Sequence, residues 1–256
     1  MRALAIPVLP CIVIALSCGG GNSKNVDAGL LSGNWQMALQ PSPPAASTPS
    51  ESGFLLQTGN SLTGHFVFAG PTQCAGLGSA QGTLTGNDVE ITLTQTGQTV
   101  TLTGTAASDG STMGGTYAVL DAGCGNGTSV GTWTANPVKP VTGMYLATFN
   151  SYTLGAYSFN VTVTQGANTG ASIATVSGTA VSSNAPCGHN LTIAGVVGGT
   201  SIVFNFLASG GTAVGQFRGT TNVAATTLNG TFDFLAQTSL ASCATGDSGS
   251  INLVQQ

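Results

Sequence analysis

Charged residues are scarce in this chain. Asp, Glu, Lys and Arg make up 5% of its 256 residues, and Lys and Arg together number only 4, whereas about 25% of an average soluble protein is charged. Binding to a phosphate backbone requires several clustered cations, so nucleic acid is excluded as a partner. The 2 histidines are too few for a His cluster, and we expect neither a metal site nor a cofactor.

Long apolar runs and helical periodicity are also missing. The one apolar run covers residues 3–16, which is shorter than the roughly 18–20 residues that span a bilayer. It follows Arg2 and ends at the small residue Ser17, and this is the organisation of a secretory signal. We therefore expect residues 1–17 to be a signal peptide.

The stretch Ala15-Leu-Ser-Cys-Gly19 closes this run. It resembles the lipobox of bacterial lipoproteins, in which a peptidase cuts before the cysteine and the thiol carries diacylglycerol. The resemblance implies that Cys18 is the lipidated N-terminus, that residues 18–30 are a flexible tether and that a lipid bilayer is a partner. Gly19 in place of an aspartate implies sorting to the outer membrane of a bacterial cell envelope. The alternative is an ordinary signal peptide, cut at another bond.

The rest of the chain contains one domain twice. The first copy covers residues 31–137 and the second covers residues 141–256, with residues 138–140 as a short linker that prolines stiffen. Compositional bias alone does not explain matches that recur in the same order. The matching segments are Leu31-Ser-Gly-Asn-Trp35 with Val141-Thr-Gly-Met-Tyr145, Gly115-Thr-Tyr117 with Gly230-Thr-Phe232, and Cys124-x-x-Gly-x-Ser129 with Cys243-x-x-Gly-x-Ser248.

Apart from Cys11 and Cys18, the cysteines fall two to a copy. An even number in an exported chain indicates two disulfides. Because the cysteine spacing recurs, the duplication predicts one bond inside each copy, and each would close a loop of about 50 residues. The predicted pairs are Cys74–Cys124 and Cys187–Cys243.

Each copy is expected to be all-β. Val89-Glu-Ile-Thr-Leu-Thr94 alternates apolar and polar residues, a turn follows, and residues 100–103 alternate again, as in a hairpin. About eight short strands per copy predict two tandem antiparallel meander β-barrels, because closure removes exposed strand edges. The segments Leu31–Trp35 and Leu62–Phe66 resemble the strand openings of eight-stranded calycin barrels, the avidins and lipocalins. Immunoglobulin-like β-sandwiches are the alternative.

One segment has the appearance of a catalytic motif. Gly246-Asp-Ser-Gly249 resembles the nucleophile loop of chymotrypsin-like proteases, in which the serine needs a histidine base. Only eight residues follow Ser248, its match Ser129 lacks the preceding acid, and neither His65 nor His189 lies in that family's histidine context. We interpret the segment as a polar turn, name no catalytic residue and expect no enzyme activity.

The loop between the first two strands of each copy is expected to cover the open end, as in calycin barrels. In the first copy it is Pro41–Glu51, and in the second it brings Phe149, Tyr152 and Tyr157 together as a candidate ligand mouth for a sugar or a small apolar ligand. Core or rim packing of these rings is the alternative. We expect a membrane-anchored envelope lipoprotein with a non-catalytic binding or structural role, whose partner is such a ligand or an envelope protein. The alternative function is a barrel-type inhibitor of a periplasmic or extracellular hydrolase.

Overall fold

The computed structural model describes residues 26–27, 29–43, 50–68, 76–121, 129–166, 173–236 and 243–256. These residues form sixteen strands. In chain order they are β1 (Gly33–Pro41), β2 (Ser50–Thr58), β3 (Ser61–Phe68), β4 (Gly76–Thr85), β5 (Asp88–Gln95), β6 (Gln98–Ala106), β7 (Met113–Asp121), β8 (Ser129–Val138), β9 (Gly143–Ser151), β10 (Ala156–Gln165), β11 (Ala174–Val181), β12 (Asn190–Gly198), β13 (Ser201–Leu207), β14 (Ala213–Thr221), β15 (Thr227–Phe234) and β16 (Asp247–Gln255).

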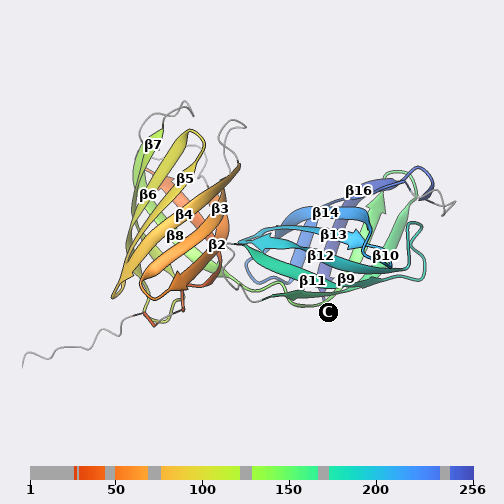
Figure 1. Cartoon of the computed structure of the whole chain (residues 1–256). Coiled ribbons are helices and arrows are strands. Elements are labelled where there is room, and N and C mark those ends of the chain that lie inside the picture. The colour runs from red at the N-terminus through yellow and green to blue at the C-terminus, as the bar shows by residue number, and fades with distance from the viewer. Residues whose placement is uncertain are drawn as a thin grey trace, which may run out of the picture.

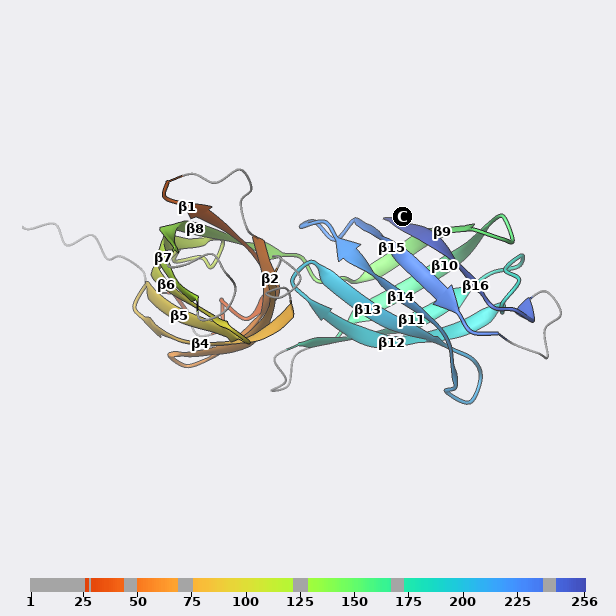
Figure 2. The same cartoon turned by 90° about the horizontal axis from the view of Figure 1, so that it is seen from above.

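The strands close into two antiparallel eight-stranded barrels. Barrel 1 comprises β1–β8 and is closed by β1 against β8, whereas barrel 2 comprises β9–β16 and is closed by β9 against β16. The two barrels lie crosswise, and Figure 2 looks along barrel 1, whose strands form a ring (Figures 1 and 2). The expected all-β fold of two tandem barrels is confirmed. In the part of the chain that the structure describes, no helix is long and apolar enough to cross a membrane.

Each barrel has a linker end, where residues 139–142 attach, and a distal end. Residues alternate between inside and outside along the strands, so that Val89, Ile91 and Leu93 of β5 are buried while Asp88 and Glu90 are exposed. This alternation is the pattern that identified the strands in the sequence. It also means that the inward residues of eight strands must fill one narrow interior.

Glycines make room for aromatic rings inside both barrels. On neighbouring strands an inward aromatic residue lies directly opposite a glycine, and a Cβ on that glycine would collide with the aromatic residue. A Cβ on Gly215 would lie 2.4 Å from Cδ1 of Phe234, whereas one on Gly131 or Gly249 would first meet a backbone carbonyl oxygen of the strand on its other side, at 2.0 or 2.1 Å. The opposed pairs include Phe66 with Gly53, Tyr117 with Gly131, Phe204 with Gly195, Phe234 with Gly215, and Phe232 with Gly249.

The segment before β1 closes the linker end of barrel 1. Leu31 is fully buried in the barrel core together with Val26. Its backbone N–H donates to Oε1 of Gln57 at 3.0 Å, and its carbonyl accepts from Nε1 of Trp35 at 3.0 Å. The chain is therefore fixed to barrel 1 from Val26 onward.

The two barrels share a packed interface. Phe54 lies on the outer side of β2, yet it is only 4% exposed and belongs to the hydrophobic cluster of barrel 2. Beside it, the turn between β12 and β13 reaches barrel 1, where Oγ of Ser52 accepts from the N–H of Thr200 at 2.5 Å. A Cβ on Gly199 would collide with Ser52 and with the backbone of β1 and β2. A glycine in this turn thus permits the close approach of the barrels.

Phe54→Ala should lower the free energy of unfolding by about 3 kcal/mol, because the truncation leaves a cavity between the barrels. The matched control is Val67→Ala on the outer side of β3, where the side chain is 36% exposed and a change of about 0.5 kcal/mol or less is expected. Urea unfolding measures both. Equal effects of the two substitutions would show that Phe54 does not join the barrels.

Candidate functional site

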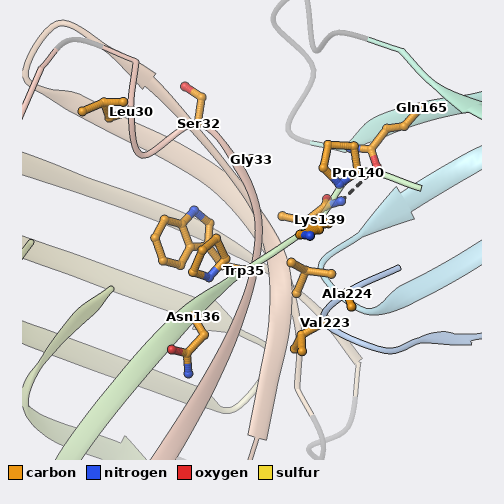
Figure 3. Close-up of a pocket in the computed structure, with 13 residues that line it drawn as sticks. Leu30, Ser32, Gly33, Trp35, Asn136, Lys139, Pro140, Gln165, Val223 and Ala224 are labelled. Atoms are coloured by element: carbon orange, nitrogen blue, oxygen red, sulfur yellow. Dashed lines mark hydrogen bonds between the residues drawn. The ribbon is translucent and has the colours of Figure 1, made fainter. Parts of the chain in front are cut away.

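A cleft lined by polar and apolar residues lies between the two barrels (Figure 3). Its volume is about 640 Å³. Leu30 and Val223 provide exposed apolar surface on its two sides. The residues that line it are Leu30, Ser32, Gly33, Asn34, Trp35, Asn136, Pro137, Val138, Lys139, Pro140, Gln165, Val223 and Ala224.

One side-chain hydrogen bond at this cleft joins the two barrels, and two further bonds hold the linker against barrel 2. Oε1 of Gln165 accepts from Nδ2 of Asn34 and from the N–H of Val141, both at 3.0 Å. The N–H of Lys139 donates to the carbonyl of Val223 at 2.9 Å. Asn34 is buried, and its Oδ1 has no hydrogen-bond partner among the described residues. The cleft offers one cation and apolar walls, and the described residues that line it include no acid or cysteine that would act as a catalytic base or nucleophile.

Barrel 2 is filled by its own rings. Phe149 lies at the centre of them, stacked on Tyr157 with ring centroids 5.1 Å apart and an interplanar angle of 15°. Rings from four other strand positions surround this pair at centroid distances from Phe149 of 4.8 to 6.1 Å, namely Phe159, Phe206, Phe232 and Phe234. Inside barrel 2, aromatic packing occupies the space in which a calycin barrel would hold a ligand.

The three residues of the predicted mouth lie in different places. Phe149 and Tyr157 are buried in the ring cluster of barrel 2, at 0% and 5% exposure. Tyr152 lies on the loop between β9 and β10 and is 76% exposed. Of the predicted mouth, Tyr152 alone presents its ring to solvent, and ligand binding there stays a prediction.

A buried carboxylate closes the distal end of barrel 2. Asp247 is 5% exposed. One carboxylate oxygen accepts from Oγ of Ser151 at 2.5 Å, and the other accepts from the hydroxyl of Tyr157 at 2.6 Å. Burial, followed by the hydrogen bond and the negative charge of Asp247, raises the pKa of Tyr157. Asp247 therefore holds two hydroxyl groups in place and has no role as a partner of Ser248, whose side chain is exposed on the outer face.

The strand register also corrects the expected match between Ser248 and Ser129. Phe232 lies opposite Gly249 in barrel 2 as Tyr117 lies opposite Gly131 in barrel 1. Ser129 and Asp247 each lie two residues before these glycines, so Asp247 is the structural equivalent of Ser129. The two copies differ by one residue between the matched cysteine and this strand, so the motif alignment is displaced there.

Barrel 1 contains an unpaired buried acid. Glu51 was expected in a loop, but β2 begins at Ser50 and the Glu51 side chain points inward, 2% exposed. Its Oε2 has no hydrogen-bond partner among the described residues, and burial raises the pKa of Glu51 to about 9. The equivalent position in barrel 2 is Phe159, since Glu51 lies opposite Met37 as Phe159 lies opposite Ala147. The fold therefore does not require a carboxyl group at this position.

The disulfide predicted in the second copy is confirmed. Cys187 and Cys243 are bonded, with Cα atoms 5.0 Å apart and a sequence separation of 56. Cys18, Cys74 and Cys124 lie outside the described residues, so the lipidation site and the first disulfide stay predictions. Within the described ranges, no group of three or more His, Cys, Asp or Glu residues is placed to hold a metal ion.

Comparisons with known proteins give no relative. No protein-family model, curated protein or solved structure matches the chain.

The two buried acids, Glu51 and Asp247, were not predicted from the sequence, although the sequence contains a signal for them. Each acid alternates in its strand with small or apolar inward residues, Glu51 with Gly53 and Leu55, and Asp247 with Gly249 and Ile251.

Replacing Glu51 by Gln should remove a pH dependence of stability. Burial raises the pKa of Glu51 to about 9 in the folded chain from its ordinary value of 4.5, so between these values only the folded chain keeps the proton. Stability therefore falls as pH rises from about 5 to 9, by at most about 1.4 kcal/mol per pH unit. Urea unfolding at pH 5, 7 and 9 should show a flatter profile for Glu51→Gln than for the parent.

The matched control for this prediction is Glu90→Gln, because Glu90 is exposed on the outer face of β5. It should keep the profile of the parent. If the parent is equally stable at pH 5 and pH 9, or if the Glu51→Gln profile keeps the slope of the parent, the buried acid is not protonated as described.

The turn before β16 gives a second comparison. Gly246 has φ of +77°, which a β-branched residue tolerates poorly. Gly246→Val should destabilise the protein by about 1–3 kcal/mol, whereas Ser248→Ala should leave thermal unfolding unchanged. A fluorophosphonate probe should label neither the parent nor either variant. Stoichiometric labelling that Ser248→Ala abolishes would identify a nucleophile and contradict the assignment of this segment as a turn.

Proposed function

We propose that the chain is an envelope lipoprotein, anchored to a bilayer through Cys18, whose two barrels form a rigid non-catalytic unit that binds through its outer surface. The outer membrane is the proposed location. The proposed partners are an envelope protein or a small apolar or sugar ligand held outside the barrels. No cofactor or metal takes part.

The observation that supports this proposal most is that side chains fill the interior of barrel 2. Its space is occupied by aromatic rings, and its buried carboxylate, Asp247, already accepts hydrogen bonds from Ser151 and Tyr157. A carrier needs an unfilled interior, and an enzyme needs convergent titratable groups with access to substrate. Binding is therefore assigned to the outer walls, the loops and the cleft between the barrels.

The anchor is supported by sequence and by the position of the first core residue. Val26 lies in the core of barrel 1, so only the short segment after Cys18 separates the fixed structure from the proposed lipid. Seven residues, 19–25, make up this segment. At about 3.5 Å per residue, the Cα atoms of Cys18 and Val26 are at most about 30 Å apart.

Cys18→Ser should move the full chain from the membrane fraction to the soluble fraction, because the acceptor of the lipid is removed. The measurement is fractionation of cells grown with an alkyne-tagged fatty acid, with Cys11→Ser as the matched control. The parent and Cys11→Ser should carry the tag and sediment with membranes. A tagged, membrane-bound Cys18→Ser variant would contradict the proposed anchor.

The loop between β9 and β10 favours a second candidate function, inhibition of a hydrolase. Oγ of Ser151 accepts from the N–H groups of Thr153 and Leu154 at 3.0 and 2.7 Å, and the same Ser151 hydroxyl is bonded to Asp247. The loop is thereby fixed while it exposes Tyr152 and Leu154, as an inhibitory loop requires. Assays of a lysozyme and of a trypsin-like protease test it: the parent should inhibit one of them and Tyr152→Ala should not.

A further inference from the structure

Charge is distributed unevenly around barrel 2. Residues 140–217 contain no Asp, Glu, Lys or Arg. The outward charges of this barrel are Arg218 on β14 and Asp233 on β15, because Asp247 of β16 points inward. The barrel order places β14 and β15 on the opposite wall from β10 and β11. We call the outward face of β16, β9, β10 and β11 the neutral wall.

Aliphatic side chains are exposed in one row across the neutral wall. Val254 of β16 lies opposite Leu146 of β9, Leu146 opposite Asn160 of β10, and Asn160 opposite Val181 of β11. Val254, Leu146 and Val181 are 46%, 41% and 47% exposed, and Met144, next along β9, is 59% exposed. The remaining outward residues of these strands are neutral and small or polar, mainly Thr, Ser and Asn.

Removing a surface of this composition from water costs little free energy. Removing a charged side chain from water is expensive, whereas hydroxyl and amide groups find partners among lipid headgroups and aliphatic groups gain by leaving water. Exposed apolar residues that gather on one face mark an interaction site. The absence of charge is as important here as the presence of aliphatic groups, because the neutral wall is broad.

Part of the neutral wall lies on the side of barrel 2 toward which the linker end of barrel 1 points. In Figure 1, β9, β11 and the C-terminus lie along the lower side of barrel 2, whereas β16 is labelled at its upper side beside β14, and the first described residues lie at the lower end of barrel 1. The linker end of barrel 1 holds Val26, and the linker end of barrel 2 holds Met144 and Val254. The Cα atom of Cys18 is at most about 30 Å from that of Val26, which is within reach of the linker end of barrel 1.

We propose that the neutral wall of barrel 2 rests on the zwitterionic lipid surface to which Cys18 anchors the chain. This inference rests on the proposed function. Anionic lipid is not the partner, because Asp27, Asp88 and Asp109 are exposed at the linker end of barrel 1, where Lys139 is the one cation among the described residues. Contact through a neutral surface should also be insensitive to salt.

Tryptophan fluorescence in vesicles tests this contact. The lipidated full chain carrying Leu146→Trp is reconstituted into phosphatidylcholine vesicles whose acyl chains are brominated, and bromine quenches tryptophan close to the bilayer. The parent serves as background, because Trp35 and Trp133 are each 1% exposed inside barrel 1. The new tryptophan should lose fluorescence in brominated relative to plain vesicles, equally in low and high salt. Val254→Trp repeats the test one strand away.

The matched control is Leu120→Trp, since Leu120 is 66% exposed on β7 near the distal end of barrel 1. It should keep its fluorescence. If the chain floats with vesicles but Leu146→Trp and Val254→Trp are not quenched, or are quenched no more than Leu120→Trp, the neutral wall does not touch lipid and the anchor stands. A blue shift of Leu146→Trp emission without bromine quenching would mean that a second copy covers the wall, which also overturns the inference. A chain that fails to float overturns the proposed function itself.

Discussion

The packing of aromatic rings over glycines is the constraint on which both barrels depend. An eight-stranded barrel has an interior just wide enough for side chains, and a glycine opposite a ring leaves space for that ring. Phe66 faces Gly53 and Phe234 faces Gly215 for this reason. Ring packing explains part of the glycine content of 38 residues, while other glycines have positive φ or lie against the backbone of a neighbouring strand. It also limits function, because an interior filled in this way leaves binding to the outer walls, the loops and the cleft.

The duplicated barrels place some of their inward rings on different strands. Barrel 2 uses Phe159 on β10, where barrel 1 has Glu51, and barrel 1 uses Phe66 on β3, where barrel 2 has Ala180. The equivalent positions carry Glu in barrel 1 and Phe in barrel 2, and no cation among the described residues pairs with the Glu. Neither the fold nor an ion pair therefore requires a carboxylate at this position. Burial therefore keeps the Glu51 carboxyl protonated over the neutral pH range, with its pKa raised to about 9, and the cost appears as the predicted loss of stability at alkaline pH.

The strands could be predicted from the sequence, but the direction and contacts of several of their side chains could not. Alternation identifies a strand regardless of its neighbours, and the duplication predicted the bond between Cys187 and Cys243. Three features depend on contacts far apart in the chain and were not predicted. Tyr157 was a candidate for the ligand mouth but faces inward to Asp247, Glu51 was expected in a loop, and Phe54 faces outward into the other barrel. An apolar side chain on an outer face does not reveal in the sequence that a second barrel covers it.

A double-mutant cycle tests the packing of rings over glycines most directly. A Cβ on Gly215 would collide with the ring of Phe234 on the opposite strand, so Gly215→Ala should destabilise the parent by about 1–3 kcal/mol. In a Phe234→Leu background the smaller side chain leaves space, and the same Gly215→Ala change should cost clearly less, with a coupling free energy of about 0.5 kcal/mol or more by urea unfolding. Additive effects of the two substitutions would contradict the claim that the glycine is there to admit the ring.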